Sequence, residues 1–357
     1  MTTLHDRYDL TSLSLPNRIV MAPMTRVRAA AGGLATPSMA TYYAQRSAAG
    51  LIVSEGVQPS LIGQSNPGTP GLYTDEQVES WRPVTDAVHT NGGRIFAQIM
   101  HGGRVSHPDT TGLQPVGPSD VPATGNVFTP TGPQQAPVPR ALELDEIPEH
   151  IKAFADAGSR AIAAGFDGVE LHGANGYLIS QFLSSDANVR NDSYGGAITN
   201  RIRFAVEAVS ATVDAIGGAR TGIRLSPASG LWGANETDVP EMYDALLTAL
   251  APLDLAYVHV EATTDEDILV AMRHAWKGTL IVNPAVPHSP AFADKAAGEH
   301  WLGLGADLIS YGRTFIANPD LVERLRTDLP LAVYDETASF MGGDHGYITY
   351  PAYQHSA

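Results

Sequence analysis

The sequence contains no cysteine, and lysine occurs only three times, as Lys152, Lys277 and Lys295. The lack of cysteine excludes disulfide bonds, thiolate metal ligands and a cysteine nucleophile. Lysine and arginine together number 22 against 38 acidic residues, which gives a formal net charge of -16. Because an acidic surface repels nucleic acids and anionic membranes, we expect neither as a partner.

Targeting segments and long hydrophobic runs are also missing. The start of the chain lacks the basic residues and apolar core of a secretion signal. No apolar run reaches the ~18 residues that a membrane span needs. We therefore expect a cytoplasmic protein. No repeat or linker divides the 357 residues, so residues 1–357 are predicted to form one domain.

Short apolar runs alternate with longer, helix-like segments along almost the whole chain. The runs are continuously apolar, as is typical of parallel strands that are buried on both faces. Eight strand–helix units predict a (β/α)8 TIM barrel, with an open doubly wound sheet as the alternative. The expected strands are 18–22, 51–54, 94–100, 168–171, 221–225, 255–260, 279–282 and 308–311. The expected helices are 38–49, 75–90, 144–164, 200–215, 238–250, 264–276, 291–302 and 318–327.

Two segments depart from this alternation. Residues 8–17 are predicted to form a β-hairpin that plugs the bottom of the barrel. Residues 102–140 follow the third strand and are rich in Gly, Pro, Thr and Gln. Because loops after barrel strands lie at the face where barrel enzymes build their sites, we expect this excursion to form a lid or cap.

The ends of the predicted strands carry hydrogen-bonding side chains but no lysine, which excludes a Schiff-base aldolase. Neither a dinucleotide-binding glycine motif nor a phosphate-binding P-loop is present. Arg313, after the eighth strand, is a bidentate partner for a phosphate. A metal-dependent hydrolase that uses His101, His172 and His259 remains an alternative at this point.

Several motifs together resemble one enzyme family. They are MAPMTR (21–26), FAQIMHGGRVS (96–106), GVELHGANGYLISQFLSSDANVRNDSYGG (168–196), NRIRF (200–204), SYGRTFIANPDL (310–321) and GYITYP (346–351). Over nearly its whole length the chain resembles the Old Yellow Enzyme family of FMN-dependent ene reductases, in its bacterial-type branch. The block at 168–196 is long and very specific.

The resemblance implies non-covalent FMN at the mouth of the barrel. It implies that the Thr25 hydroxyl binds flavin O4, that Gln98 pairs with the pyrimidine edge, and that Arg224 lies near N1 and O2. Positive charge there stabilises the reduced flavin. The other FMN residues it implies are Pro23, Met24, Gly56, His172, Asn283, Gly312 and Arg313, the last two at the phosphate.

The resemblance also implies the catalytic residues. His172 and Asn175 bind the carbonyl or nitro oxygen of the substrate, and Tyr177 protonates the α-carbon. NADPH, in preference to NADH, is the implied reductant. The implied substrates are enones, enals, maleimides and nitroalkenes, with nitro compounds and nitrate esters as further candidates. A non-catalytic flavin-binding protein is the second alternative, and a monomer or homodimer is expected.

Some positions depart from the family pattern. Asn175 stands where much of the bacterial-type branch has His, and Thr25 stands where a thermostable-type branch has Cys. The loop after the seventh strand reads Asn283-Pro284-Ala285 where glycines are usual, and Pro284 offers no N–H to a phosphate. Met100 replaces a frequent Trp in the substrate pocket, to which Tyr347 is also assigned.

Met100 should make this pocket tolerant of bulky substrates, because a thioether side chain is flexible. We expect Met100→Trp to lower kcat/KM for bulky enones more than for cyclohexenone. Steady-state kinetics on both substrates check this prediction, and an unchanged ratio between them would contradict it.

Overall fold

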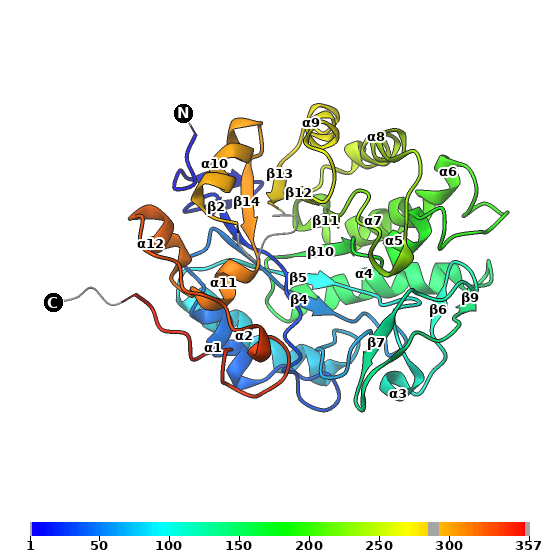
Figure 1. Ribbon diagram of the computed structural model, residues 1–357, viewed down its shortest axis with the longest axis horizontal. Coiled ribbons are helices and arrows are strands. Elements are labelled where there is room, and N and C mark those ends of the chain that lie inside the picture. The colour runs from blue at the N-terminus through cyan, green and yellow to red at the C-terminus, as the bar shows by residue number, and fades with distance from the viewer. Residues whose placement is uncertain (1, 285–292, 354–357) are drawn as a thin grey trace.

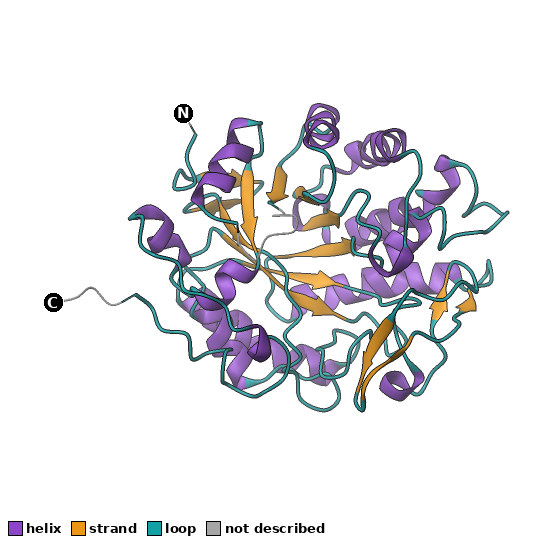
Figure 2. Ribbon diagram, viewed as in Figure 1, coloured by secondary structure: helices purple, strands orange, loops and turns teal. Residues whose placement is uncertain are grey.

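The eight predicted strands form a closed parallel barrel in the computed structural model, which describes residues 2–284 and 293–353 (Figures 1 and 2). Each strand pairs with the next in the chain, and the last pairs with the first. This closure confirms the barrel and excludes the open sheet. The strands are β3 (Ile19–Met21), β4 (Leu51–Val57), β5 (Ile95–Ile99), β10 (Gly168–Gly173), β11 (Thr221–Leu225), β12 (Tyr257–Glu261), β13 (Leu280–Asn283) and β14 (Leu308–Tyr311).

Helices cover the outside of the barrel (Figure 2). Those in the eight predicted segments are α1 (Pro37–Ala44), α2 (Asp75–Thr90), α4 (Ile147–Ala163), α7 (Arg203–Ile216), α8 (Val239–Leu250), α9 (Glu266–Ala275), α10 (Lys295–Gly303) and α12 (Leu321–Arg326). Residues 291 and 292 of the seventh predicted helix lie outside the described residues. Short helices α5 (Leu178–Leu183), α6 (Ile198–Arg201) and α11 (Arg313–Ala317) occupy connections. Within the described ranges, no helix is long and apolar enough to cross a membrane.

The amino-terminal hairpin closes one end of the barrel, as predicted. Strands β1 (Tyr8–Leu10) and β2 (Leu13–Leu15) pair antiparallel. Leu10 and Leu15 are fully buried in a cluster with barrel residues such as Val20, Phe96 and Ile281. The hairpin therefore supplies the apolar floor of the barrel.

The excursion after β5 gathers on the lower right of Figure 1. It contains α3 (Pro108–Thr111), β6 (Val116–Gly117), the antiparallel pair β7 (Asn126–Thr129) and β8 (Gly132–Gln135), and β9 (Arg140–Ala141). The buried guanidinium of Arg104 donates to the carbonyls of Val121 and Pro122 at 3.1 Å and to the carbonyl of Trp232 at 3.0 Å. This one side chain ties the excursion to the loop after β11.

The barrel interior changes from apolar to polar along its axis. Side chains alternate along each strand, so Tyr257, His259 and Glu261 of β12 point to the same side. Tyr257 belongs to the apolar floor cluster, whereas His259 and Glu261 hydrogen-bond to other strands near the carboxyl ends. The polar layer therefore lies at the end of the barrel where such enzymes place their sites.

The floor should contribute strongly to stability. Leu15→Ala removes a fully buried side chain, and we expect it to lower the free energy of unfolding by about 2–5 kcal/mol, because a cavity remains. Equilibrium denaturation by urea measures the change. The exposed neighbour Ser14 provides the control, since Ser14→Ala should change stability by less than ~0.5 kcal/mol. Equal effects of the two substitutions would contradict the floor's role.

Candidate active site

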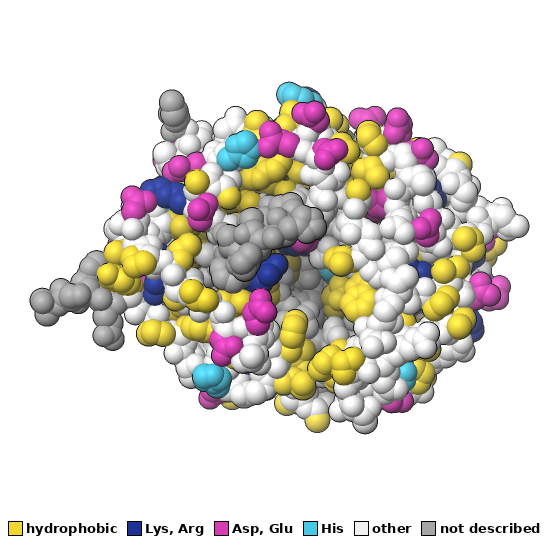
Figure 3. Space-filling model, viewed as in Figure 1, with side chains coloured by type: hydrophobic (Ala, Val, Ile, Leu, Met, Phe, Trp, Pro, Cys, Tyr) yellow, Lys and Arg dark blue, Asp and Glu magenta, His cyan; other side chains and the backbone are white. Residues whose placement is uncertain are grey.

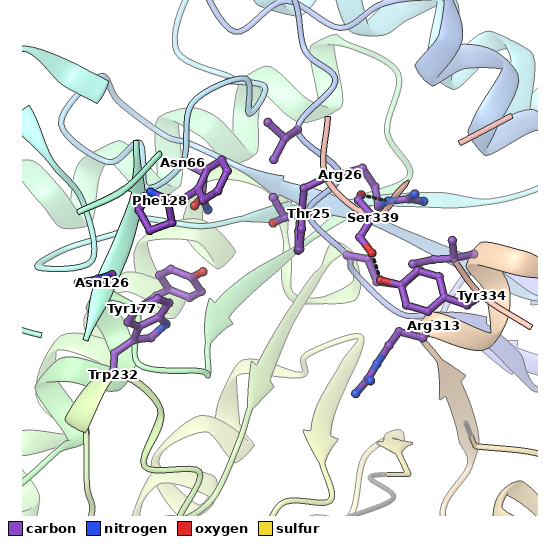
Figure 4. A pocket seen from close by; sticks show the side chains of 15 residues that line it. Thr25, Arg26, Asn66, Asn126, Phe128, Tyr177, Trp232, Arg313, Tyr334 and Ser339 are labelled. Carbon is purple, nitrogen blue, oxygen red and sulfur yellow. Dashed lines mark hydrogen bonds between the residues drawn. The ribbon is translucent and has the colours of Figure 1, made fainter. Parts of the chain in front are cut away.

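A cavity of about 510 Å³ opens at the carboxyl ends of the barrel strands. Figure 3 shows the hollow near the centre of this face, with hydrophobic side chains on its rim. Figure 4 shows its two walls. One wall carries Tyr177, Trp232, Phe128, Asn126 and Asn66; the other carries Arg313, Tyr334, Ser339 and Arg26, with Thr25 between the walls.

A buried network of charged and polar side chains crosses the barrel beside this cavity. His259 Nδ1 lies 2.8 Å from Glu170 Oε2, and its Nε2 lies 3.1 Å from Arg224 Nη1 and 2.7 Å from Ser310 Oγ. A guanidinium only donates, so His259 accepts at Nε2 and its proton sits on Nδ1, facing Glu170. Burial favours a neutral Glu170, but His259 and Arg224 outweigh burial and lower the pKa of Glu170. The pair therefore consists of a carboxylate and a neutral imidazole.

Two further acceptors fix the guanidinium of Arg224. Its Nη2 donates to Glu261 Oε2 and to Asn283 Oδ1, each at 2.9 Å. Asn283 in turn donates from Nδ2 to the carbonyl of Ser310 at 2.9 Å. Burial opposes ionisation of Glu261, but the adjacent Arg224 outweighs it and lowers the pKa of Glu261. Arg224 is therefore held in one orientation by side chains of β12 and β13.

His172 is a neutral hydrogen-bond donor in this arrangement. Gln98 Nε2 donates to Glu170 Oε1 at 2.8 Å and lies 3.4 Å from His172 Nδ1. Because Nδ1 accepts from this amide, the proton of His172 sits on Nε2. Burial, followed by the charge of Arg224, lowers the pKa of His172 to about 3. His172 thus presents an N–H at neutral pH without carrying a charge.

The loop after β10 places Asn175 and Tyr177 beside His172. Asn175 adopts φ 58°, a left-handed conformation that Asn tolerates, and its N–H donates to Ser226 Oγ at 2.8 Å. Gly176 adopts φ 75°, and an added Cβ there would lie 2.5 Å from the Leu231 carbonyl oxygen. Gln181 of α5 donates to the Gly176 carbonyl at 2.8 Å. Steric fit and hydrogen bonds therefore determine this loop geometry.

Tyr177 lies in the wall of the cavity, with its ring centroid 5.2 Å from that of His172. Burial raises the pKa of Tyr177 above its usual value of 10.0, although hydrogen bonds with Ser65 and Asn66 partly oppose the shift. The phenol is therefore protonated throughout the neutral range. The site therefore places a proton donor, the Tyr177 phenol, beside a hydrogen-bond donor, the His172 N–H, that can bind an oxygen atom.

The structure brings together most residues that the sequence assigns to FMN. Met24, Thr25 and Arg313 line the cavity. Gln98, His172, Arg224 and Asn283 belong to the connected network. Pro23 and Gly312 adjoin cavity residues in the chain, and Gly56 pairs with Gln98 across β4 and β5. Ala285 of the loop after β13 lies outside the described residues.

The two residues assigned to the substrate pocket have other surroundings. Met100 is 3% exposed and packs on Gly56, where an added Cβ would lie 2.9 Å from its Sδ. Tyr347 is fully buried, and its ring stacks on Tyr42 with centroids 4.2 Å apart. Neither side chain belongs to the described lining of the cavity. Their assignment to the substrate pocket stays a prediction.

The cavity has the chemistry that FMN requires. Two buried polar atoms at the network, Asn175 Oδ1 and Arg224 Nε, have no hydrogen-bond partner within the described residues. Such atoms are costly unless a ligand or water satisfies them. The walls combine a guanidinium and hydroxyl groups with aromatic and aliphatic surface. This combination fits a planar aromatic ring system joined to an anionic group.

The metal-hydrolase alternative receives no support from the geometry. Across residues 2–284 and 293–353, no three His, Asp or Glu side chains are grouped to hold a metal ion. His101 accepts from the Gly103 N–H at 3.0 Å and contacts His150 at 3.1 Å. His172 and His259 are engaged by Gln98 and Glu170. The three histidines of that alternative do not converge.

Several site residues were not predicted from the sequence. Phe128 lies in β7 of the excursion and Trp232 in the loop after β11, and no periodic pattern in the sequence reveals how these two segments fold. Tyr334 and Ser339 come from the carboxyl-terminal segment and hydrogen-bond to each other. Glu261 is also absent from the flavin and substrate residues predicted from the sequence. Its alternation with His259 on one strand was the signal that it points into the barrel.

Known proteins match the chain in sequence and in structure. Residues 6–332 match the model of the NADH:flavin oxidoreductase / NADH oxidase family. 12-oxophytodienoate reductase 7 of Oryza sativa subsp. japonica is 37% identical over 98% of this chain and 94% of its own. The Old Yellow Enzyme homologue of Zymomonas mobilis superposes with a TM-score of 0.94 at 38% identity, covering 98% of this chain and 100% of its own. Morphinone reductase in complex with tetrahydroNAD gives a TM-score of 0.93 at 39% identity, covering 99% and 98%.

The low pKa of His172 has a testable consequence. We expect the imidazole to stay neutral, with its proton on Nε2, down to about pH 5, because it gains charge only near a pKa of about 3. Since an unfolded His takes up a proton near 6.5, the stability that His172 contributes is lost as pH falls from about 6.5 toward 3. Imidazole ¹⁵N NMR checks the tautomer, with the His172→Gln spectrum as the assignment control. A titration midpoint near 6 would contradict the prediction.

Proposed function

We infer that this chain, which belongs to the NADH:flavin oxidoreductase / NADH oxidase family, is an FMN-dependent, NAD(P)H-oxidising reductase of activated C=C bonds. The observation that carries the assignment is the group of His172, Asn175 and Tyr177 at the barrel mouth. This group adjoins a cavity lined by Thr25 and Arg313. An oxygen-binding pair and a proton donor next to a flavin site are what alkene reduction needs.

We propose that the residues assigned from the sequence hold FMN. Arg224, Gln98 and Thr25 would bind the polar edge of the ring, with Pro23, Met24 and Gly56 beside it. Arg313, Gly312 and Asn283 would lie toward the phosphate. When bound, FMN supplies the hydride that NAD(P)H delivers and that the β-carbon of the alkene accepts. Arg224 Nε, which has no hydrogen-bond partner among the described residues, supports this placement.

The chain's own residues then bind and protonate the substrate. His172 Nε2–H and the Asn175 amide would donate to the carbonyl or nitro oxygen, which withdraws electron density from the alkene. Tyr177 would donate its proton to the α-carbon and recover it from solvent. Because the phenol is protonated at neutral pH, it needs no separate activation.

The substrates proposed carry the oxygen that His172 and Asn175 would bind. We propose enones, enals, maleimides and nitroalkenes as substrates, with nitro compounds and nitrate esters as further candidates. The solved complex of morphinone reductase with tetrahydroNAD supports a nicotinamide as reductant. NADPH is the preferred form in this proposal.

The surroundings of the site complete the proposal. We propose that residues 102–140 act as a cap, since Phe128 and Asn126 of this segment line the cavity. One domain over residues 1–357, a cytoplasmic location, a monomer or homodimer, and the lack of nucleic-acid partners stay predictions from the sequence.

The test of this function separates the two half-reactions. We expect Tyr177→Phe to slow reduction of cyclohexenone by the reduced enzyme by about 10²–10⁴-fold, because the general acid is lost. Reduction of the bound flavin by NADPH should stay within about threefold. Anaerobic stopped-flow absorbance of each half-reaction measures both rates.

Two controls accompany this experiment. Tyr8→Phe removes a hydroxyl at the barrel floor, where Tyr8 meets Thr279 at 2.8 Å, and should leave both rates unchanged. The double variant His172→Ala/Asn175→Ala should lose enone reduction while retaining yellow FMN. Equal slowing of both half-reactions in Tyr177→Phe would contradict the acid role. A purified wild-type protein without flavin would overturn the function itself.

A further inference from the structure

Glu261 is placed against the cation of the site. It is the last residue of β12, and in the barrel register it lies opposite Asn283 of β13. Its carboxylate accepts from Arg224 Nη2 at 2.9 Å. Arg224 is 5% exposed and Glu261 24% exposed, so water screens this ion pair far less than a surface pair.

The same carboxylate also reaches the substrate-binding pair. A hydrogen bond from Asn175 stabilises the ionised form of Glu261 and thereby helps to lower its pKa. Asn175 Oδ1 has no partner among the described residues. Glu261 thus connects the residue proposed to bind the flavin with one proposed to bind the substrate.

Arg224 does not need Glu261 to stay in place. Asn283 Oδ1 holds the same Nη2 at 2.9 Å, and His259 receives Nη1 at 3.1 Å. Both of these partners are neutral acceptors, whereas Glu261 adds a full negative charge. The feature that distinguishes Glu261 from the other partners is therefore its charge.

We propose that Glu261 is a positioning residue whose carboxylate weakens the electrostatic effect of Arg224 on reduced FMN and so lowers the potential of the flavin. The inference rests on the proposed function, in which Arg224 faces the part of the ring that gains negative charge. A carboxylate beside that cation repels the same charge. The enzyme with Glu261 is then the stronger hydride donor to alkenes and the slower acceptor from NADPH.

The experiment compares Glu261→Gln with the wild-type holoenzyme. Gln keeps an oxygen that accepts from Arg224 but removes the charge. We expect the ratio of the Kd for oxidised FMN to the Kd for reduced FMN to rise about tenfold, which for a two-electron couple corresponds to ~30 mV toward positive potential. Titration of the apoprotein with FMN under air gives the Kd for oxidised FMN, and titration with dithionite present gives the Kd for reduced FMN. The ratio can be measured even if the variant binds FMN more weakly.

Two variants isolate the cause. Glu261→Asp keeps the charge, so the ratio should change by less than about threefold. Glu79→Gln removes one carboxylate from the exposed surface of α2, where the side chain is 67% exposed, and should leave the ratio unchanged. Stopped-flow should show faster flavin reduction by NADPH and slower alkene reduction in Glu261→Gln only.

Each result decides between the two proposals. A flavin-loaded wild type whose Gln variant shows no rise in the ratio overturns the role of Glu261 and leaves the reductase assignment intact. Equal shifts in the Gln and Asp variants also overturn it, because placement rather than charge would then be the cause. A wild type that binds no FMN overturns the proposed function and this inference with it.

Discussion

The site depends on one constraint: ionised groups buried inside the barrel must be paired. Glu170, Arg224 and Glu261 occupy the polar layer, and each is stable there only because neighbours satisfy it. His259 is central to this arrangement, since its two ring nitrogens connect Glu170 to Arg224. Through Gln98 the same network also fixes the tautomer of His172. Removing Arg224 would leave the carboxylates of Glu170 and Glu261 without a cation in the barrel, so the proposed flavin and substrate residues form a single unit.

The strands were predictable because both of their faces are buried. A parallel strand inside a helix layer must be apolar almost throughout. An apolar run such as 221–225 therefore predicts where the strand begins and ends. Polar residues within these apolar strands indicated the site for the same reason. A residue such as Arg224 in an otherwise apolar strand is retained at a cost, and it lies in the site.

Other features could not be inferred from local pattern. Trp232 adopts φ 58° in a loop held by the distant Arg104, and no periodicity encodes such a contact. Tyr347 shows the opposite case, because its motif suggests the pocket while tertiary packing stacks it on Tyr42. The Glu261–Arg224 pair depends on the register between β11 and β12, which sets His259 opposite Arg224 and Glu261 two residues further along β12. Site residues that lie on single strands could be predicted from the sequence. Site residues that are brought together by contacts between loops could not.

The hairpin floor has a kinetic consequence. Leu10 and Leu15 fill the lower barrel, so reactants reach the polar layer from the opposite end, through the cavity bounded by Tyr177 and Arg313. In the proposed function, coenzyme and alkene would both approach the flavin through this cavity. If they exclude each other there, double-displacement kinetics follow, in which an excess of either reactant inhibits the other. The hairpin floor thus leaves both reactants the same face of the barrel.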